Sequence, residues 1–230
     1  NRLLDLFVED GKGNQEIIRL ERESYRQPAF PAGRSNPGER NWNKTQRNTP
    51  NIKFISRPDV IDKLDREGLL PAITFIFSRK ACDAAVHQCL TAGIRLTTSE
   101  ERSEIREVIA RAAKNILEED LLVLGFDQWS DALERGIAAH HAGLLPTFKE
   151  AVEELFQRGL VKAVFATETL ALGINMPAKT VVLEKLTKWN GESHVAVTPG
   201  EYTQLTGRAG RRGIDIEGNA VILWTKDLDS

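Results

Sequence analysis

The sequence has no strong excess of charge of either sign, few cysteines and no long apolar run. Its 31 Lys and Arg residues nearly balance 33 Asp and Glu residues, so any anionic ligand must be bound by a local cluster. The two cysteines, Cys82 and Cys89, lie in a predicted helix with roughly 10 Å between their Cα atoms, too far apart for a disulfide. No apolar run reaches the roughly 18 residues of a membrane span, and we expect a cytoplasmic protein without membrane contact.

The length and composition suit one α/β domain with an appended segment. At 230 residues, 41% of them hydrophobic, the chain can bury a substantial core. Because it begins at Asn1 rather than at methionine, we expect it to be part of a longer protein. Residues 1–56 are rich in Pro, Gly, Asn and Arg, which predicts a flexible, partly disordered linker or arm. Its basic part, from Arg34 to Arg57, is either a solvated linker or an arm that lies on a phosphate backbone.

From residue 57 onward, β-rich runs alternate with amphipathic helical patterns. The run Ala72–Phe77 is continuous and apolar, which is typical of a buried parallel strand. Thr98 and Glu101 form a capping-box pattern at the start of a charged helix, and residues 97–135 are expected to be a helical insertion. The alternation predicts an α/β fold, a parallel sheet with helices on both faces, in which ligands bind beyond the carboxyl ends of the strands. Further strands are predicted within residues 136–143, 161–167, 179–186 and 219–224.

A helix start precedes a cluster of glycines and arginines near the end of the sequence. The stretch "TPGEYTQLTGRAGRRGID" begins with a capping threonine, Thr198, followed by Pro199 at the first helical position. Glu201 stands three residues after the cap, which completes a capping-box pattern. The sequence therefore predicts a helix that begins at about Pro199 and closes around Gly210.

Within this predicted helix, Gln204, Arg208 and Arg211 recur at spacings of four and three residues, which places them on one face. Two glycines flank that face. Glycine costs a helix roughly 0.5–1 kcal/mol relative to alanine, so their presence favours close approach by another body. A carboxamide and two guanidiniums form an anion clamp, and a phosphoryl group is the expected ligand. The alternative is that the arginines only solvate a helix end, and Arg212 fits that role.

Longer stretches of the sequence resemble a known family. "ATETLALGINMPAKTVV" followed by "EYTQLTGRAGRRGID" resembles motifs V and VI of superfamily 2 helicases, and "ITFIFSRKACD" resembles their motif IV. The resemblance extends from Arg57 to about Thr225 and is greatest to the Ski-type DExH RNA helicases, in particular the bacterial HelY-type branch. It implies a RecA-like fold and identifies residues 57–230 as the helicase C-terminal domain, the second of two RecA-like domains in a motor.

The half of the motor that holds a metal is missing from the sequence. No stretch fits the Gly-x-x-x-x-Gly-Lys-Ser/Thr phosphate loop, and no Asp-Glu-x-His box is found. The resemblance implies ATP with Mg²⁺ as cofactors, the metal being held by the first RecA-like domain. It implies an ATP-dependent RNA helicase, with the fragment alone inactive. The implied partners are single-stranded or 3′-tailed RNA, that first domain, and an RNA-degrading complex for RNA processing and decay. Two alternatives stay open: a DNA-repair helicase of the same superfamily, and a non-catalytic RecA-like binding module.

The resemblance also implies roles for residues near the nucleotide. Arg208 and Arg211 match the motif VI arginines that reach the γ-phosphate when the two domains close. Gln204 matches the glutamine that helps orient them. In motif V, Gly173 and Asn175 match positions that approach the nucleotide, and many relatives have aspartate where Asn175 stands.

Residues at the ends of three predicted strands match positions that contact the nucleic-acid backbone. Hydroxyls and amides there can bind phosphate without reading bases. For His140 and His141 an alternative stays open, because each is either such a residue or a packed or turn-capping histidine. The pair Asn190-Gly191 predicts a hairpin, which is either a strand-separating wedge or a plain turn. The expected nucleic-acid-binding residues are Thr167, Glu168, Thr169, Ser78, Arg79, His141 and Gly143.

Overall fold

A computed structural model of the chain describes residues 3–5, 12–19, 55–171 and 176–223. The chain divides into two units, Asn1–Ile55 and Ser56–Ser230. The predicted basic arm lies almost entirely outside the described residues. The described helicase-like motifs belong to the second unit.

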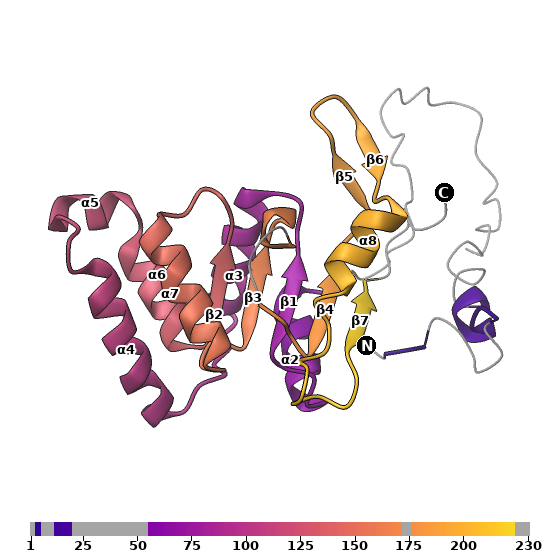
Figure 1. The fold of residues 1–230 in the computed structure, drawn as a ribbon, viewed down its shortest axis with the longest axis horizontal. Helices are drawn as coiled ribbons and strands as arrows, with labels where there is room; N and C mark the ends of the chain where they lie inside the picture. The colour runs from indigo at the N-terminus through magenta and orange to yellow at the C-terminus, as the bar shows by residue number, and fades with distance from the viewer. Residues whose placement is uncertain (1–2, 6–11, 20–54, 172–175, 224–230) are drawn as a thin grey trace, which may run out of the picture. The chain divides into compact units, whose positions relative to one another are not determined.

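A parallel sheet forms the centre of the second unit (Figure 1). Every pair of neighbouring strands is parallel, and β1 to β4 bury all of their residues, as strands covered on both faces do. The predicted RecA-like α/β fold is thereby confirmed. In spatial order the strands are β2 (Ile137–His140), β3 (Ala163–Ala166), β1 (Ala72–Phe75), β4 (Thr180–Leu183) and β7 (Asn219–Ile222).

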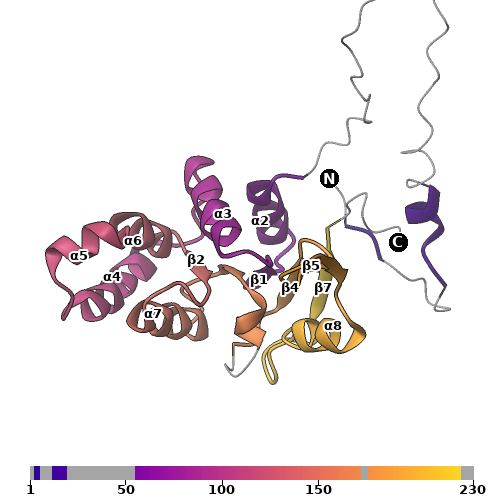
Figure 2. The same cartoon turned by 90° about the horizontal axis from the view of Figure 1, so that it is seen from above.

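Helices cover both faces of this sheet, which Figure 2 shows from above. On one face lie α2 (Arg57–Arg66) and α3 (Arg79–Thr91), and on the other lie α7 (Pro146–Gln157) and α8 (Pro199–Thr206). The helices of the predicted insertion gather beside β2, at one edge of the sheet (Figures 1 and 2). They are α4 (Ser99–Ala113), α5 (Glu118–Val123) and α6 (Phe126–Glu134).

The insertion packs on the core through α4 and α6. The apolar positions Ile105, Val108 and Ile109 of α4 are buried, as their helical spacing predicts. Trp129 of α6 stacks on Phe148 of α7 with 4.1 Å between the ring centroids. In contrast, α5 buries none of its residues.

Local sequence accounts for the starts of several elements. The side chains of Thr98 and Thr198 each accept a hydrogen bond from the backbone N–H of a glutamate three residues later. The side chain of that glutamate accepts from the backbone N–H of the threonine, so both predicted capping boxes are confirmed. Ser78 caps α3 in the simpler way, by accepting from the N–H of Ala81. These caps fix the direction in which each helix leaves the preceding strand or loop.

The predicted hairpin is present between β4 and α8. It consists of β5 (Thr187–Trp189) and β6 (His194–Ala196), which extend beyond the sheet on the side of its carboxyl ends (Figure 1). The Asn190 Oδ1 atom accepts two backbone N–H bonds within the turn, at 2.9 and 2.8 Å. Gly191 adopts a φ of 108°, a conformation that favours glycine. Within the described ranges, no helix is both long and apolar enough to cross a membrane.

Candidate functional site

The helix that carries Gln204 is shorter than the sequence pattern predicts. It ends at Thr206, with Gly207 as the C-cap residue. Arg208 and Arg211 therefore lie in the turn that follows and do not share a helix face with Gln204. The predicted stacking at helical spacing is wrong, because the backbone leaves the helix at Gly207. We call residues 207–218 the arginine turn.

The glycines of the arginine turn allow two segments of backbone to pass close to each other. A Cβ atom on Gly218 would lie 2.4 Å from the carbonyl carbon of Ala209, and Gly210 has a φ of +90°. The turn is bridged to Ala178, whose N–H donates to the Arg208 carbonyl at 2.9 Å and whose carbonyl accepts from Gly210 N–H at 2.7 Å. At Gly210, one of the two glycines expected to bare a surface for a ligand, the approaching body is thus the chain itself, at Gly218.

Asp215 holds the side chain of Arg211. The Arg211 Nε and Nη2 atoms donate to Oδ2 and Oδ1 of Asp215, each at 2.8 Å, and the Arg211 backbone N–H donates to Oδ2 at 2.9 Å. The Asp215 side chain is only 5% exposed. The hydrogen bonds from the Arg211 guanidinium lower the pKa of Asp215 to about 2 and, in return, raise the pKa of Arg211. Sequence reasoning missed Asp215, although its opposite charge four residues after Arg211 was an available signal.

Arg208 connects the arginine turn to motif V. Its Nη2 atom donates a hydrogen bond to the carbonyl oxygen of Ala171. Ala171 ends η1 (Glu168–Ala171), a short 3-10 helix after β3 that α8 contacts. The structure therefore brings motif VI beside the start of motif V. Gly173 and Asn175 lie outside the described residues, and their nucleotide contacts stay predictions.

The other predicted site residues lie at the carboxyl ends of β1, β2 and β3. These strands are neighbours in the sheet, so their loops lie along one edge of it. We call residues 76–79, 141–143 and 167–169 the carboxyl-edge loops. The structure brings together here all of the residues that were predicted to contact nucleic acid.

His141 is held inside its loop. Its Nδ1 atom accepts from the backbone N–H of Gly143 at 3.1 Å, so Nε2 carries the proton and donates to Asp83 Oδ1 at 2.9 Å. The ring is 6% exposed, and its bond from Gly143 caps the turn. Contact of His141 with nucleic acid stays a prediction. His140 is buried as well, with Nε2 2.8 Å from Glu153 Oε1, and burial lowers its pKa. Both rings are thus packed inside the protein at this edge of the sheet.

The remaining carboxyl-edge residues combine internal hydrogen bonds with exposed groups. Thr167 is 6% exposed, and its hydroxyl shares a 2.9 Å hydrogen bond with the hydroxyl of Thr169. Glu168 and Thr169 are exposed. The hydroxyl of Ser78 is used to cap α3, and Arg79, the first residue of that helix, is exposed. The groups that face outward are therefore backbone, one hydroxyl, one carboxylate and one guanidinium.

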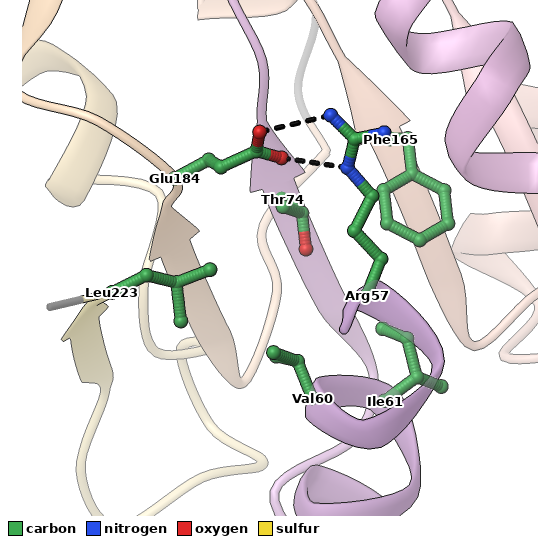
Figure 3. A pocket seen from close by; sticks show the side chains of 7 residues that line it. All are labelled: Arg57, Val60, Ile61, Thr74, Phe165, Glu184 and Leu223. Carbon is green, nitrogen blue, oxygen red and sulfur yellow. Dashed lines mark hydrogen bonds and ion pairs between the residues drawn. The ribbon is translucent and has the colours of Figure 1, made fainter. Parts of the chain in front are cut away.

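An ion pair between Arg57 and Glu184 lines a small pocket next to α2 (Figure 3). The Nε and Nη2 atoms of Arg57 donate to the two carboxylate oxygens of Glu184, both at 2.9 Å. These bonds raise the pKa of Arg57. Val60, Ile61 and Phe165 line the same space, and the pair holds α2 against the carboxyl end of β4. Arg57, counted above with the basic arm, therefore has a structural role within the domain.

The two cysteines are unreactive parts of α3. Cys82 and Cys89 are free and buried, as the sequence predicts, and burial raises the pKa of each thiol to about 12. In the described part of the chain, no group of three or more His, Cys, Asp or Glu side chains is arranged to hold a metal ion. The groups suited to a phosphorylated cofactor are the guanidiniums of the arginine turn.

Comparison with known proteins agrees with the motifs. Residues 108–213 match the helicase conserved C-terminal domain. The chain is 54% identical to the protein named "Probable helicase HelY" of Mycobacterium tuberculosis (strain ATCC 25618 / H37Rv), over 99% of this chain and 25% of that protein. It is 37% identical to the DExH-box ATP-dependent RNA helicase DExH10 of Arabidopsis thaliana, over 95% of this chain and 23% of the relative. It is 39% identical to the antiviral helicase SKI2 of Saccharomyces cerevisiae, over 72% of this chain and 13% of the relative. The chain thus spans a quarter or less of the length of these relatives.

Proposed function

Because the chain belongs to the Ski-type DExH helicases of superfamily 2, as their second RecA-like domain, we propose that it is half of an ATP-dependent RNA helicase motor. ATP with Mg²⁺ would bind between this domain and a first RecA-like domain that lies outside this chain. That first domain would hold the metal, and this domain would contribute Arg208 and Arg211 to the phosphates, with Gln204, Gly173 and Asn175 nearby.

The observation that carries the proposal is the arginine turn. Arg208 and Arg211 lie in one short segment that is fixed by backbone hydrogen bonds to Ala178 and by the close passage of Gly218. Guanidiniums held at fixed positions can stabilise charge on a transferring phosphoryl group without reorganising during the reaction. Arginine fingers of this kind contribute about 10³- to 10⁵-fold to turnover.

The carboxyl-edge loops support the second part of the proposal, a track for the RNA backbone. Their exposed groups include Arg79, Glu168, the Thr169 hydroxyl and the N-terminal end of α3. A cation, a hydroxyl and the free N–H groups of a helix start bind phosphates in a way that does not depend on base sequence. Thr167, Ser78, His141 and Gly143 would act here by shaping the loops. RNA rather than DNA is favoured because the relative DExH10 is named an RNA helicase.

The two parts of the proposal depend on each other. Arginines that act across a cleft stabilise the reaction only when the cleft is closed, and RNA bound to both domains would favour closure. ATP hydrolysis would therefore depend on RNA, and this chain alone would neither hydrolyse ATP nor unwind a duplex. A degrading complex that consumes the unwound RNA is the expected partner of the whole protein.

The proposal is tested by ATP turnover of the full-length helicase that carries this domain, with and without single-stranded RNA. Arg211→Ala is compared with Arg212→Ala, which removes the same charge from an exposed neighbour that forms no ion pair with any described residue. We expect RNA to stimulate the wild type and Arg212→Ala, and the Arg211→Ala rate to fall by about 10³-fold or more.

Other outcomes would contradict parts of the proposal. Equal turnover of Arg211→Ala and the wild type would exclude the finger. Equal stimulation by single-stranded DNA and RNA would favour the DNA-repair helicase. No turnover by the wild type under any condition would favour the non-catalytic binding module.

A further inference from the structure

The guanidinium of Arg211 is occupied on only one of its edges. A guanidinium carries five N–H donors and can bind an oxyanion through two parallel N–H groups. Asp215 takes one bond from Nε and one from Nη2, so three of the five donors remain. Two of these are on Nη1 and one is on Nη2, and among the residues that the structure describes, none of them has a partner. The edge formed by Nη1 and Nη2 is thus available for a second oxyanion.

Asp215 is itself fixed to the backbone of the turn. Its Oδ2 atom also accepts the backbone N–H of Arg211 at 2.9 Å. The backbone N–H groups of Ile214 and Asp215 both donate to the carbonyl of Arg211, at 3.0 and 2.9 Å. Backbone and side chain of the two residues therefore form one closed unit. An arginine side chain otherwise samples many rotamers, and this unit restricts Arg211 before any ligand arrives.

Asp215 is the more buried member of its pair with Arg211. The Asp215 side chain is only 5% exposed and the Arg211 side chain is 25% exposed, so the carboxylate lies on the inner side of the pair. Arg208 also has a fixed partner, because its Nη2 atom donates to the carbonyl of Ala171.

We propose that Asp215 is a positioning residue, which orients Arg211 so that its Nη1–Nη2 edge faces the γ-phosphoryl group of ATP. This inference rests on the proposed role of Arg211. Asp215 does not touch the nucleotide in this account. Its contribution is preorganisation, since a guanidinium that is already aligned does not have to be ordered during the reaction.

The test uses the full-length helicase with saturating single-stranded RNA. Asp215→Asn keeps the size of the side chain but removes its charge and replaces one acceptor oxygen with a donor, so one of the paired bonds to Nε and Nη2 is lost. We expect kcat for ATP hydrolysis to fall about tenfold, which is typical when a group that orients an active residue is removed. The KM for ATP should change by less than about twofold, because the loss falls on the transition state. Asp215→Glu, which retains the carboxylate, should lose less than Asp215→Asn.

A double-mutant cycle separates positioning from a general structural role. In an Arg211→Ala background, Asp215→Asn should change the remaining turnover by less than about twofold, because the group that it orients is gone. An equal fall in both backgrounds, or no fall in the Arg211-containing protein, would overturn the inference. If Asp215→Asn does not fold, Asp215→Glu in the same two backgrounds decides the question in the same way.

The cycle also distinguishes this inference from the proposed function. If Arg211→Ala keeps full turnover, the proposed role of Arg211 as an arginine finger is wrong, and so is the role of Asp215 in positioning it. If Arg211→Ala loses turnover and both Asp215 variants retain it, the finger stands and only the role of Asp215 is wrong.

Discussion

The arginine turn and the carboxyl-edge loops present their polar groups in opposite ways. In the arginine turn, Arg211 is held by Asp215 and Arg208 donates to the carbonyl of Ala171. In the carboxyl-edge loops, the side chains of Ser78, Thr167 and His141 use their polar atoms within the protein. The exposed side chains there include Arg79, Glu168 and Thr169.

This difference fits two different ligands. A transferring phosphoryl group gains charge during the reaction and requires a cation at a fixed place. A nucleic-acid backbone repeats the same phosphate and sugar along its length, and a cation, hydroxyls and backbone N–H groups can hold it at many positions. Under the proposed function, ATP would bind at the arginine turn and RNA at the carboxyl-edge loops. Each prediction below changes one region and measures the ligand proposed for it, or the stability that supports it.

The largest effect is expected at Arg208. Arg208→Ala should lower RNA-stimulated ATP turnover of the full-length helicase by about 10³-fold, because it removes a guanidinium that motif V holds in place. Arg208→Lys should recover little, since an ammonium lacks the planar fork. Steady-state ATP hydrolysis at saturating RNA measures the effect, with Arg212→Lys as the control. Full activity of Arg208→Lys would show that charge alone suffices and that the geometry of the turn does not matter.

The backbone of the arginine turn should be sensitive at Gly218. Gly218→Ala places a Cβ atom 2.4 Å from the Ala209 carbonyl carbon, and we expect it to lower the free energy of unfolding by roughly 1–3 kcal/mol. Gly200→Ala is the matched control, because no atom lies within 4 Å of its Cβ position and alanine favours the helix. Urea unfolding of the three proteins measures the difference. Equal stability of the two variants would contradict the close passage of the backbone.

At the carboxyl edge, His141→Ala should weaken RNA binding about tenfold. The substitution removes two hydrogen bonds, one from Gly143 N–H within the loop and one to Asp83. Each such bond contributes about 0.5–1.5 kcal/mol. Asp83→Asn, which retains an acceptor for Nε2–H, should weaken binding less. Fluorescence anisotropy with a short single-stranded RNA at one fixed salt concentration measures both. Unchanged affinity in His141→Ala would exclude this loop from the RNA track.

The local sequence predicted the parts of this comparison that depend on neighbouring residues. The capping boxes, the apolar strands and the Asn190-Gly191 hairpin follow from patterns a few residues long, and the structure has all of them. The end of α8 could not be predicted in this way, because it depends on pairing of the turn with Ala178 and on the passage of Gly218. The role of His141 likewise required its contact with Asp83, which is distant in the sequence.

The smallest effect concerns the dependence of stability on pH. The pKa of Asp215 is lowered to about 2 in the folded protein, against roughly 3.9 in an unfolded chain. A lowered pKa stabilises the fold above the unfolded value, and this stabilisation is lost as the pH falls from about 4 through about 2. The difference in free energy of unfolding between the wild type and Asp215→Asn should therefore shrink over that range.

Urea unfolding of both proteins at several pH values between about 5 and 2 measures this dependence. Glu201, whose pKa is also lowered to about 2 through its hydrogen bond with Lys188, is unchanged in both proteins, so it does not contribute to their difference. If the difference in free energy of unfolding between the two proteins stays constant with pH, the charge of Asp215 does not stabilise the arginine turn.

The most direct test of the division between the two regions is the RNA affinity of Arg211→Ala. The full-length variant is titrated with fluorescent single-stranded RNA, in samples whose ATP turnover is measured in parallel. The Kd for RNA should stay within about twofold of the wild type while turnover is lost. A loss of RNA affinity that matches the loss of turnover would contradict the account, because it would place RNA as well as ATP on the arginine turn.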